Sequence, residues 1–295
     1  MQGNGILSGN NLNTSDLAET PPAPVPLRLP ARILRLLRAV THPLYWWYEQ
    51  KLVNEVSGGR IPQHIGVILD GNRRFARGIG LDARKGHEFG VEKVHELLEW
   101  CLELGIANVT LFVFSAENFA RTPDEVEYLF NLFVRESQKL IEHPRIKKHK
   151  VRVKVIGRRA HLPDTVVSAT ETLENSTAEH DGMLLNIAFG YGGREEIVDG
   201  VKKLLLEAET KHRSPADIAA QLSAAQISDY LYTAGTPDPD FIIRTSGEQR
   251  LSGFLLWQAA YSEYYFCDAL WPSFRRIDFL RAIRSYQGRE RRFGS

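Results

Sequence analysis

Short apolar runs and helical apolar stripes alternate along the chain from about residue 61. The apolar runs predict strands at residues 64–69, 108–114, 151–156, 184–189 and 241–244, because such runs are typical of strands buried on both faces. Apolar positions at helical spacing predict helices at residues 87–104, 163–178 and 194–206 and another beginning after Thr122. Strands alternating with helices predict an α/β fold, a single domain in which helices cover a mainly parallel sheet.

The chain before residue 61 divides into two parts. Residues 1–26 are rich in Gly, Asn, Ser, Thr and Pro, a composition that predicts a disordered tail. Residues 27–60 combine an apolar stripe with arginines and the aromatic run Tyr45, Trp46, Trp47 and Tyr48. This extension could be a basic amphipathic helix on a membrane surface, or a helix packed on the main domain. Residues 61–295 are expected to form that domain.

The polar segment after the first predicted strand is the strongest candidate for a functional site. An apolar run ends at Leu69, and Asp70-Gly-Asn-Arg-Arg follows at once. In open α/β sheets, ligands bind beyond the carboxyl ends of the strands. Gly71 allows the backbone to approach a ligand closely, and the arginines add positive charge.

Three further polar segments begin at or just beyond predicted strand ends, at Ser115, Gly190 and Arg244. A parallel sheet would bring all four segments to one edge. Arginine, hydroxyl, glycine and carboxylate groups predominate there. Arginine binds phosphate through paired hydrogen bonds, and Mg²⁺ prefers one or two carboxylates together with phosphate oxygens. This combination of arginine, hydroxyl, glycine and carboxylate groups predicts a site that binds diphosphates.

Composition narrows the class of protein. The 37 Lys and Arg residues against 36 Asp and Glu give a net charge of +1, which does not favour nucleic acid as a partner. Two cysteines do not predict a disulfide framework, and a reducing, cytoplasmic location is expected. No apolar run approaches the roughly 20 residues of a membrane-spanning helix, and the first residues lack the order of a signal peptide.

Two common nucleotide-binding motifs are absent. The sequence has neither G-x-x-x-x-G-K-[ST] nor G-x-G-x-x-G, so nucleotide hydrolysis and hydride transfer are disfavoured. Large apolar residues lie near the expected site. They could be ordinary core or the lining for an apolar substrate tail: Phe89, Phe112, Phe114, Phe119, Phe130, Leu132 and Phe133.

Five ordered motifs from about residue 61 to 294 resemble the cis-prenyltransferases, the undecaprenyl diphosphate synthase family. They are I-L-D-G-N-R-R-F-A, G-H at 86–87, F-S-A-E-N-F-A-R at 114–121, G-Y-G-G-R-E-E-I-V from 190, and the segment from Asp240 that includes R-T-S-G-E-Q-R-L-S-G. The resemblance implies a six-stranded, mainly parallel sheet with a hydrophobic tunnel. It also implies a Mg²⁺-dependent Z-polyprenyl diphosphate synthase. Such an enzyme condenses isopentenyl diphosphate sequentially onto an allylic diphosphate, such as farnesyl or geranylgeranyl diphosphate.

The resemblance assigns roles residue by residue. It implies catalytic roles for Asp70 and Asn118, with Asn118 assisting proton removal to an acceptor that is left open, and a magnesium site formed by Asp70 and Glu263. It implies substrate binding by Gly71, Asn72, Arg73, Arg74, Phe75, His87, Ser115, Ala116, Glu117, Phe119, Arg121, Arg244, Arg250, Leu251, Ser252, Arg292 and Gly294.

The chain departs from the family pattern at three positions. Ala116 stands where serine or threonine is frequent, and Gly253 where asparagine is frequent. Ala83 replaces an arginine four residues before His87, with Arg84 beside it. Whether Arg84 takes over that phosphate contact is left open.

Two rival classes fit less well. A non-catalytic subunit of this family would be expected to lack the aspartate that is present as Asp70. A trans-prenyltransferase needs D-D-x-x-D motifs on helices, whereas the nearest segment here is Pro237-Asp-Pro-Asp240, in which proline indicates a turn.

The resemblance also carries expectations about product and assembly. The segment 125–150 is close in length to that of family members making medium or long chains, so a product of that class is expected. Arg292-Phe-Gly294 resembles a C-terminal R-x-G motif, which implies a homodimer whose sites are completed in trans. Peripheral association with the inner face of a membrane is a further expectation.

Overall fold

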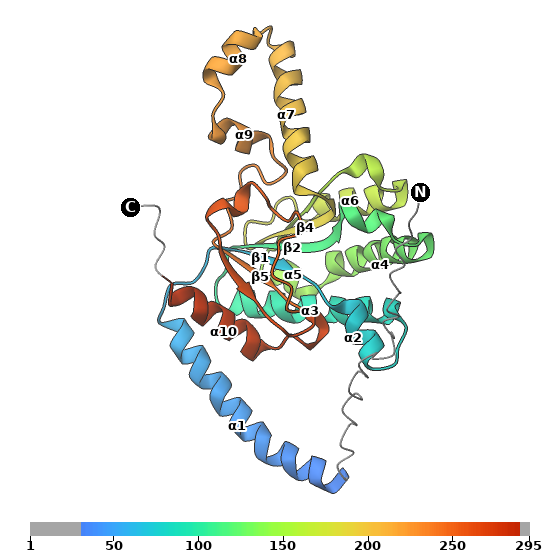
Figure 1. Ribbon diagram of the computed structural model, residues 1–295, viewed down its shortest axis with the longest axis vertical. Coiled ribbons are helices and arrows are strands. Elements are labelled where there is room, and N and C mark those ends of the chain that lie inside the picture. The colour runs from blue at the N-terminus through green and yellow to red at the C-terminus, as the bar shows by residue number, and fades with distance from the viewer. Residues whose placement is uncertain (1–30, 290–295) are drawn as a thin grey trace, which may run out of the picture. The chain divides into compact units, whose positions relative to one another are not determined.

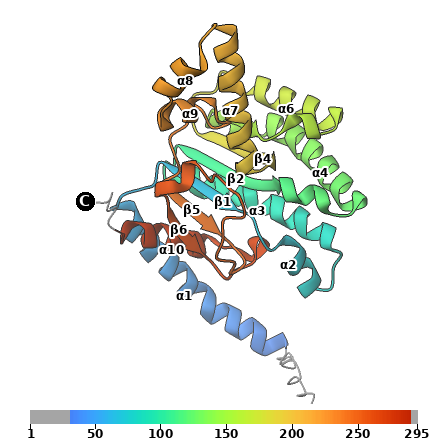
Figure 2. The same cartoon turned by 45° about the horizontal axis from the view of Figure 1, so that its top comes forward.

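A six-stranded sheet forms the centre of the protein (Figures 1 and 2). The computed structural model describes residues 31–289, except for the side chains of residues 31–42 and 44. The strands are β1 (His64–Ile68), β2 (Asn108–Ser115), β3 (Arg152–Ile156), β4 (Leu184–Tyr191), β5 (Phe241–Arg244) and β6 (Glu263–Phe266). Their order is β3-β4-β2-β1-β5-β6, and every neighbouring pair is parallel. The predicted α/β fold with a six-stranded sheet is confirmed.

Helices lie in every connection between successive strands from β1 to β5, as parallel pairing requires, and further helices precede β1 and follow β6. They are α1 (Ala31–Ser57), α2 (Asn72–Gly78), α3 (Ala83–Glu103), α4 (Pro123–Glu142), α5 (Pro144–Lys148), α6 (Asp164–Ser176), α7 (Gly193–Thr210), α8 (Pro215–Gln221), α9 (Ala224–Tyr230) and α10 (Arg276–Gln287). Helices α7, α8 and α9 lie together, away from α10, in both views (Figures 1 and 2).

Two apolar clusters cover the two faces of the sheet. Alternate residues of β1, such as Ile65 and Val67, join the larger cluster with buried residues of α3, α4, α6 and α10. Ile68 faces the other side, where Phe254 and Leu255 of the segment after β5 belong to the smaller cluster. This alternation follows from the two-residue period of a strand. The larger cluster, which includes residues of α3 and α4, lies on one face of the sheet.

Three local features differ from the expectation. Residues 72–78, expected as a loop, form α2, and β6 follows β5 where only a loop was expected. The segment Thr122-Pro-Asp-Glu125 has the pattern of a capping box; Thr122 is indeed the N-cap residue of α4 and Pro123 begins the helix, but the Thr122 side chain makes no capping hydrogen bond. Both missed elements are short and depend on partners distant in sequence: α2 packs on α3, and β6 pairs with β5.

Helix α1 makes up most of residues 27–60, the segment that was expected to be an extension of the main domain. The compact unit of the chain begins at Trp47, before the expected boundary at residue 61. Leu52 and Val56 are fully buried, and Glu55 forms an ion pair with Arg284 of α10. The second half of α1 is therefore part of the main fold. Residues 1–26 lie outside the described residues.

Candidate active site

The carboxyl edge of the sheet carries the four polar segments named from the sequence. Asp70 follows β1, Ser115 ends β2, Tyr191 ends β4 and Arg244 ends β5. The parallel register places Ile68 beside both Phe112 and Arg244. Segments far apart in the sequence thus meet at one edge, as expected from the strand pattern.

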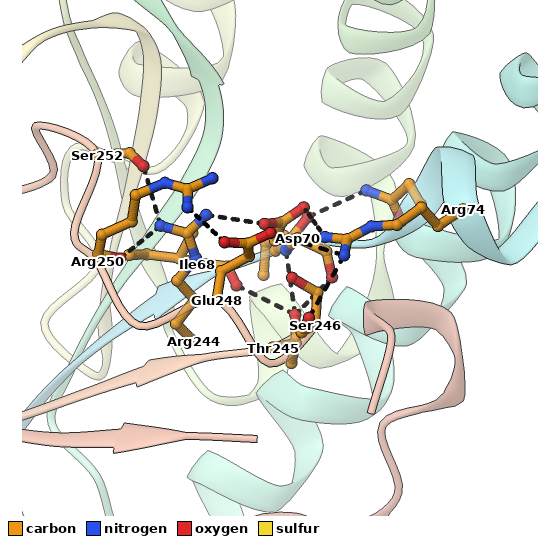
Figure 3. A network of polar contacts seen from close by, with 11 residues as sticks. Ile68, Asp70, Arg74, Arg244, Thr245, Ser246, Glu248, Arg250 and Ser252 are labelled. Carbon is orange, nitrogen blue, oxygen red and sulfur yellow. Dashed lines mark hydrogen bonds and ion pairs between the residues drawn. The ribbon is translucent and has the colours of Figure 1, made fainter. Parts of the chain in front are cut away.

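An ion pair between Asp70 and Arg244 lies at the centre of this edge (Figure 3). Arg244 Nη2 donates to Asp70 Oδ2 at 2.8 Å, and the Arg244 side chain is only 5% exposed. Its Nη1 donates to the Arg250 carbonyl and, at 2.9 Å, to Ser252 Oγ. Arg244 therefore holds the Asp70 carboxylate and the loop of residues 250–252 together. Leu251 in that loop packs against the smaller apolar cluster.

Backbone contacts fix where Asp70 points. Thr245 Oγ1 donates to the Asp70 carbonyl at 2.7 Å and lies 3.1 Å from the Asp70 amide nitrogen. Gly71 has φ 113°, and a Cβ there would come within 3.0 Å of the Leu270 backbone. A side chain at this position would be strained, so glycine allows the chain to turn from β1 into α2.

The Asp70 carboxyl is kept ionised by its neighbours. Burial alone would raise its pKa, but hydrogen bonding and charge from Arg244, with the charge of Arg74, lower the pKa below its usual value. Arg74 Nη2 lies 3.2 Å from Asp70 Oδ1. An ionised carboxylate among arginines suits a site that binds a metal ion and phosphate together.

Glu248 is a second carboxylate in this cluster, and the motif resemblance assigns it no role. Its Oε1 lies 3.9 Å from Arg74 Nη1, and its other oxygen pairs with Arg250 (Figure 3). The segment R-T-S-G-E-Q-R contains Glu248 between two assigned arginines. That position in the motif was the signal that could have identified it.

A second charged cluster surrounds Glu125 at the start of α4. Arg121 Nη1 lies 2.8 Å, Arg73 Nη1 3.4 Å and His87 Nε2 3.9 Å from the Glu125 carboxylate. Burial, together with the charge of Arg121, lowers the pKa of His87 to about 4. His87 is therefore neutral near pH 7, and its Nε2 has no hydrogen-bond partner among the described residues.

The segment after β2 forms a short 3₁₀ helix, Ala116–Ala120. Asn118 Oδ1 accepts a hydrogen bond from the Ser115 amide at 3.1 Å. This bond fixes the Asn118 side chain at the end of β2 and occupies its oxygen. Glu117 is exposed, and the ring of Phe119 packs edge-on against Phe114, with centroids 5.0 Å apart.

An apolar tunnel opens beside the arginine cluster. It has an empty volume of about 880 Å³, including its opening, and runs from Leu69, Asn72 and His87 between α3, α4 and the sheet. Asn72 Nδ2 donates to the Leu69 carbonyl at 3.2 Å.

The large apolar residues near the expected site, which could be core or lining, divide between the tunnel and the core. Phe114, Leu132 and Phe133 line the tunnel. Phe112 instead belongs to the opposite face of the sheet, Phe119 and Phe130 pack against the larger cluster, and Phe89 packs against Phe75 with ring centroids 5.6 Å apart.

Glu263 does not join Asp70 within one chain. It begins β6 and pairs in register with Phe241, which itself pairs with Ile65. Ile65 lies five residues before Asp70, so Glu263 is at the amino edge, about 16 Å away along the strands. There it forms an ion pair with Arg289 at 2.8 Å. Arg292 and Gly294 lie outside the described residues.

Two further properties concern the described residues only. They contain no cluster of three or more His, Cys, Asp or Glu side chains that could hold a metal ion without other ligands. None of their helices is both long enough and apolar enough to span a membrane.

The fold and the site together define a class of enzyme. An arginine-rich edge with an ionised carboxylate binds an anionic head group, and the tunnel beside it accepts an apolar tail. This combination is expected of an enzyme that acts on lipid-like diphosphates.

Comparisons with known proteins identify the family. Residues 68–294 match the family described as "Putative undecaprenyl diphosphate synthase". An isoprenyl transferase of Thermus thermophilus is 63% identical over 262 residues, covering 89% of this chain and all of that protein. A (2Z,6E)-farnesyl diphosphate synthase of Thermobifida fusca is 49% identical over 253 residues, covering 85% and 97%.

A solved structure agrees with these matches. Lavandulyl diphosphate synthase from Lavandula x intermedia, in complex with dimethylallyl diphosphate, superposes with a TM-score of 0.75 at 32% identity, covering 80% of this chain and 99% of that one. The chain belongs to the undecaprenyl diphosphate synthase family. It is a cis-prenyltransferase that elongates prenyl diphosphates, and the family implies isopentenyl and allylic diphosphates as its substrates.

Proposed function

We propose that this enzyme adds isopentenyl diphosphate repeatedly to an allylic diphosphate such as farnesyl or geranylgeranyl diphosphate, and releases a medium- or long-chain Z-polyprenyl diphosphate. The observation that carries the proposal is the Asp70–Arg244 ion pair beside the mouth of the apolar tunnel. The diphosphate would bind at the arginines while the growing chain enters the tunnel.

Two substrate positions follow from the arrangement of the arginines. His87 lines the tunnel, Arg73 shares the Glu125 carboxylate with it and Arg74 pairs with Asp70, so these three side chains would bind the allylic diphosphate. Arg250 and Ser252, joined through Arg244, would bind isopentenyl diphosphate. Breaking the allylic C–O bond leaves negative charge on the diphosphate oxygens, and fixed cationic groups stabilise that charge in the transition state.

Mg²⁺ fits the residues present. The lowered pKa of Asp70 provides an ionised oxygen ligand, and Mg²⁺ needs only one or two carboxylates when phosphate oxygens complete its shell. We propose Asp70 as the protein ligand, with Glu248 nearby. Bound Mg²⁺ would neutralise charge on the diphosphate.

The proton removed after each condensation would pass to a diphosphate oxygen. Because Asn118 Oδ1 already accepts the Ser115 amide hydrogen, its role would be orientation through the side-chain nitrogen. The apolar lining of the tunnel would exclude water from the carbocation.

We also propose a homodimer. Glu263 and Arg289 are paired at the amino edge of the sheet, so the C-terminal residues that follow begin far from the Asp70 of their own chain. Helix α7 presents Val198, Val201 and Leu205 on one face, at 48%, 40% and 51% exposure. Such an apolar stripe is typical of an interaction surface. Arg292 and Gly294, and with them Glu263, would serve the neighbouring site.

A cytoplasmic location at the inner face of a membrane is proposed from the aromatic run in α1. Tyr45, Trp46 and Trp47 are 48%, 62% and 58% exposed, and such side chains favour the interface between lipid and water. A polyprenyl product would also partition into that membrane.

The test uses purified protein, Mg²⁺, labelled isopentenyl diphosphate and allylic primers of different length. Chromatography of the products should show a series of additions ending at a medium or long chain. Extension that stopped at farnesyl length would contradict the proposed product class, and no incorporation with any primer would contradict the proposed reaction.

A further inference from the structure

An open cleft lies beside β3, the outermost strand of the sheet, and α7 bounds its other side. Its empty volume is about 1420 Å³, including the opening, and residues 154–161, Leu206 and Tyr232 belong to its lining. Among the described residues, none that lines this cleft also lines the tunnel or forms an ion pair with Asp70. The cleft is therefore separate from the candidate active site.

The side chains around the cleft carry an excess of positive charge. Five positive charges against two negative ones leave a net charge of +3, whereas the whole chain has only +1. Such a local excess attracts anions. The charged residues of the lining are Lys154, Arg158, Arg159, Lys202 and Lys203, together with Glu174 and Asp199.

Both carboxylates of the cleft already have arginine partners. Asp199 accepts hydrogen bonds from Arg158 Nε at 2.7 Å and from Arg158 Nη2 at 2.8 Å. Glu174 accepts one from Arg159 Nη2 at 2.6 Å, and its other oxygen accepts the Val155 amide hydrogen at 2.9 Å. The two negative charges therefore neutralise the two arginines and not the lysines.

Three lysines of the cleft form no ion pair in the part of the chain that the structure describes. Lys154 belongs to β3, whereas Lys202 and Lys203 belong to α7, so the lysines come from two walls of the cleft. Lys203 Nζ lies 5.2 Å from the centre of the Tyr232 ring, and this cation–π contact keeps the ammonium group at the lining. An anion with two charged groups can contact both walls at once.

The segment that joins the two walls is held in a fixed conformation. Gly157 has φ 143°, and a Cβ there would lie 2.1 Å from the Phe189 carbonyl oxygen. The Arg158 amide donates to the Gly190 carbonyl at 3.1 Å, and Arg158 Nη2 donates to the Glu195 carbonyl at 3.4 Å. A cationic wall that is already ordered loses little conformational entropy when an anion binds.

We propose that this cleft is a second anion site, which binds a diphosphate group between the lysines of β3 and α7. Phosphate groups are ionised near pH 7 and offer several acceptor oxygens, so the two phosphates of one diphosphate can pair with lysines on both walls. The proposed reaction releases inorganic diphosphate at each condensation, and prenyl diphosphates carry the same group. The inference rests on the proposed function only for the source of this ligand.

Equilibrium dialysis with labelled inorganic diphosphate tests the site directly, with Mg²⁺ and both substrates omitted. Wild-type protein should bind diphosphate at the active site and in the cleft. Lys202→Ala with Lys203→Ala should remove one bound diphosphate per chain, or weaken its binding at least about tenfold, because charge-assisted hydrogen bonds are lost. Incorporation of isopentenyl diphosphate should stay at the wild-type level, since neither lysine lies in the active site.

The matched control removes the same charge elsewhere. Lys147→Ala with Lys148→Ala, at two exposed positions of α5, should leave the bound diphosphate unchanged. Lys154→Ala, on the other wall of the cleft, is a second test variant and should weaken the same bound diphosphate. All variants are checked for folding by circular dichroism. Wild-type binding in both cleft variants would overturn the inference, and so would an equal loss in the α5 control, which would indicate general attraction by surface charge.

A further arm identifies the source of the diphosphate group. Geranyl diphosphate is dialysed under the same conditions against wild type and the Lys202, Lys203 variant. Loss of one bound molecule per chain in the variant would show that the cleft takes the head group of a prenyl diphosphate. Loss confined to inorganic diphosphate would show that it takes the released anion. Because dialysis needs no turnover, a wild-type enzyme that incorporates no isopentenyl diphosphate would refute the proposed reaction and not the cleft site.

Discussion

Asp70 illustrates how one side chain depends on groups from distant parts of the sequence. Its two oxygens contact Arg244 from β5 and Arg74 from α2. The local sequence places a carboxylate at a strand end. Arg244, Ser246 and Arg74, which are distant from one another or from Asp70 in the sequence or lie on other elements, lower its pKa and hold it ionised.

Replacing this carboxylate should separate activity from folding. Asp70→Ala is expected to reduce kcat by about a hundredfold or more, since a transition-state stabilising group typically contributes about 3 kcal/mol. Arg244 keeps its bonds to Arg250 and Ser252, so the fold should persist. The measurement is incorporation of labelled isopentenyl diphosphate at saturating Mg²⁺, with circular dichroism.

The exposed carboxylate Asp82, whose side chain is 57% exposed, provides the control. Asp82→Ala should keep wild-type turnover. Undiminished turnover of Asp70→Ala would show that Asp70 is not the metal ligand.

His87 gives a pH dependence with a defined sign. Its pKa is about 4 in the fold and about 6.5 when unfolded. Between these values the unfolded chain binds the extra proton, so this contribution is fully present above pH 6.5 and is lost as the pH falls toward 4. The expected loss between pH 7 and pH 4.5 is about 2.5 kcal/mol.

The measurement is the free energy of unfolding in urea at both pH values. The decrease from pH 7 to pH 4.5 should be smaller in His87→Asn than in wild type, because asparagine does not titrate. His149→Asn, an exposed substitution, should retain the wild-type difference. Equal pH dependence in His87→Asn and wild type would contradict the assignment.

At the scale of elements, only the part of α1 from Trp47 onward belongs to the compact unit that contains the sheet. Ion pairs or hydrogen bonds join this part to α10, among them Glu49 with Arg276, Tyr48 with Arg281 and Glu55 with Arg284. These contacts lie beside the buried Leu52 and Val56.

Truncation of Leu52 tests whether this part of α1 is structural. Leu52→Ala should lower the free energy of unfolding by about 2–5 kcal/mol, since it leaves a cavity at a fully buried position. Leu206→Ala on α7, where leucine is 62% exposed, should change it by about 0.5 kcal/mol or less. Urea unfolding measures both, and a loss in Leu52→Ala no larger than in the control would mean that α1 does not stabilise the fold.

At the scale of the whole molecule, the proposed dimer predicts complementation between subunits. One chain carries Asp70→Ala and the other ends at Gln287, and each should be inactive alone. In a mixed dimer one site combines an intact Asp70 with the intact tail of its neighbour. Part of the activity should therefore return when differently tagged chains are expressed together.

Formation of the mixed dimer is verified by purification through both tags. If the tail completed the site of its own chain, each site in the mixed dimer would remain defective. A purified mixed dimer without activity would therefore contradict the trans arrangement of Arg292 and Gly294.

The sequence by itself determined most of the helices and strands, though not α2 or β6, and the edge at which the site lies. Apolar runs ending in polar segments after Leu69 and Phe114 are local signals, because a buried strand must be apolar along its length while its end may reach solvent. The motif residues then identified diphosphate chemistry, since the charges and hydroxyls of Asp70, Arg244 and Ser252 are properties of the residues themselves.

Tertiary structure decided which of these residues meet. The strand order placed Glu248 beside Arg74 and Glu263 at the opposite edge, and the register shift near Val113 in β2 brought Phe114 into the tunnel lining. The stack of His95 on His143 likewise joins separate helices. Such relations depend on pairing and packing between residues distant in sequence, which local patterns of polarity do not encode.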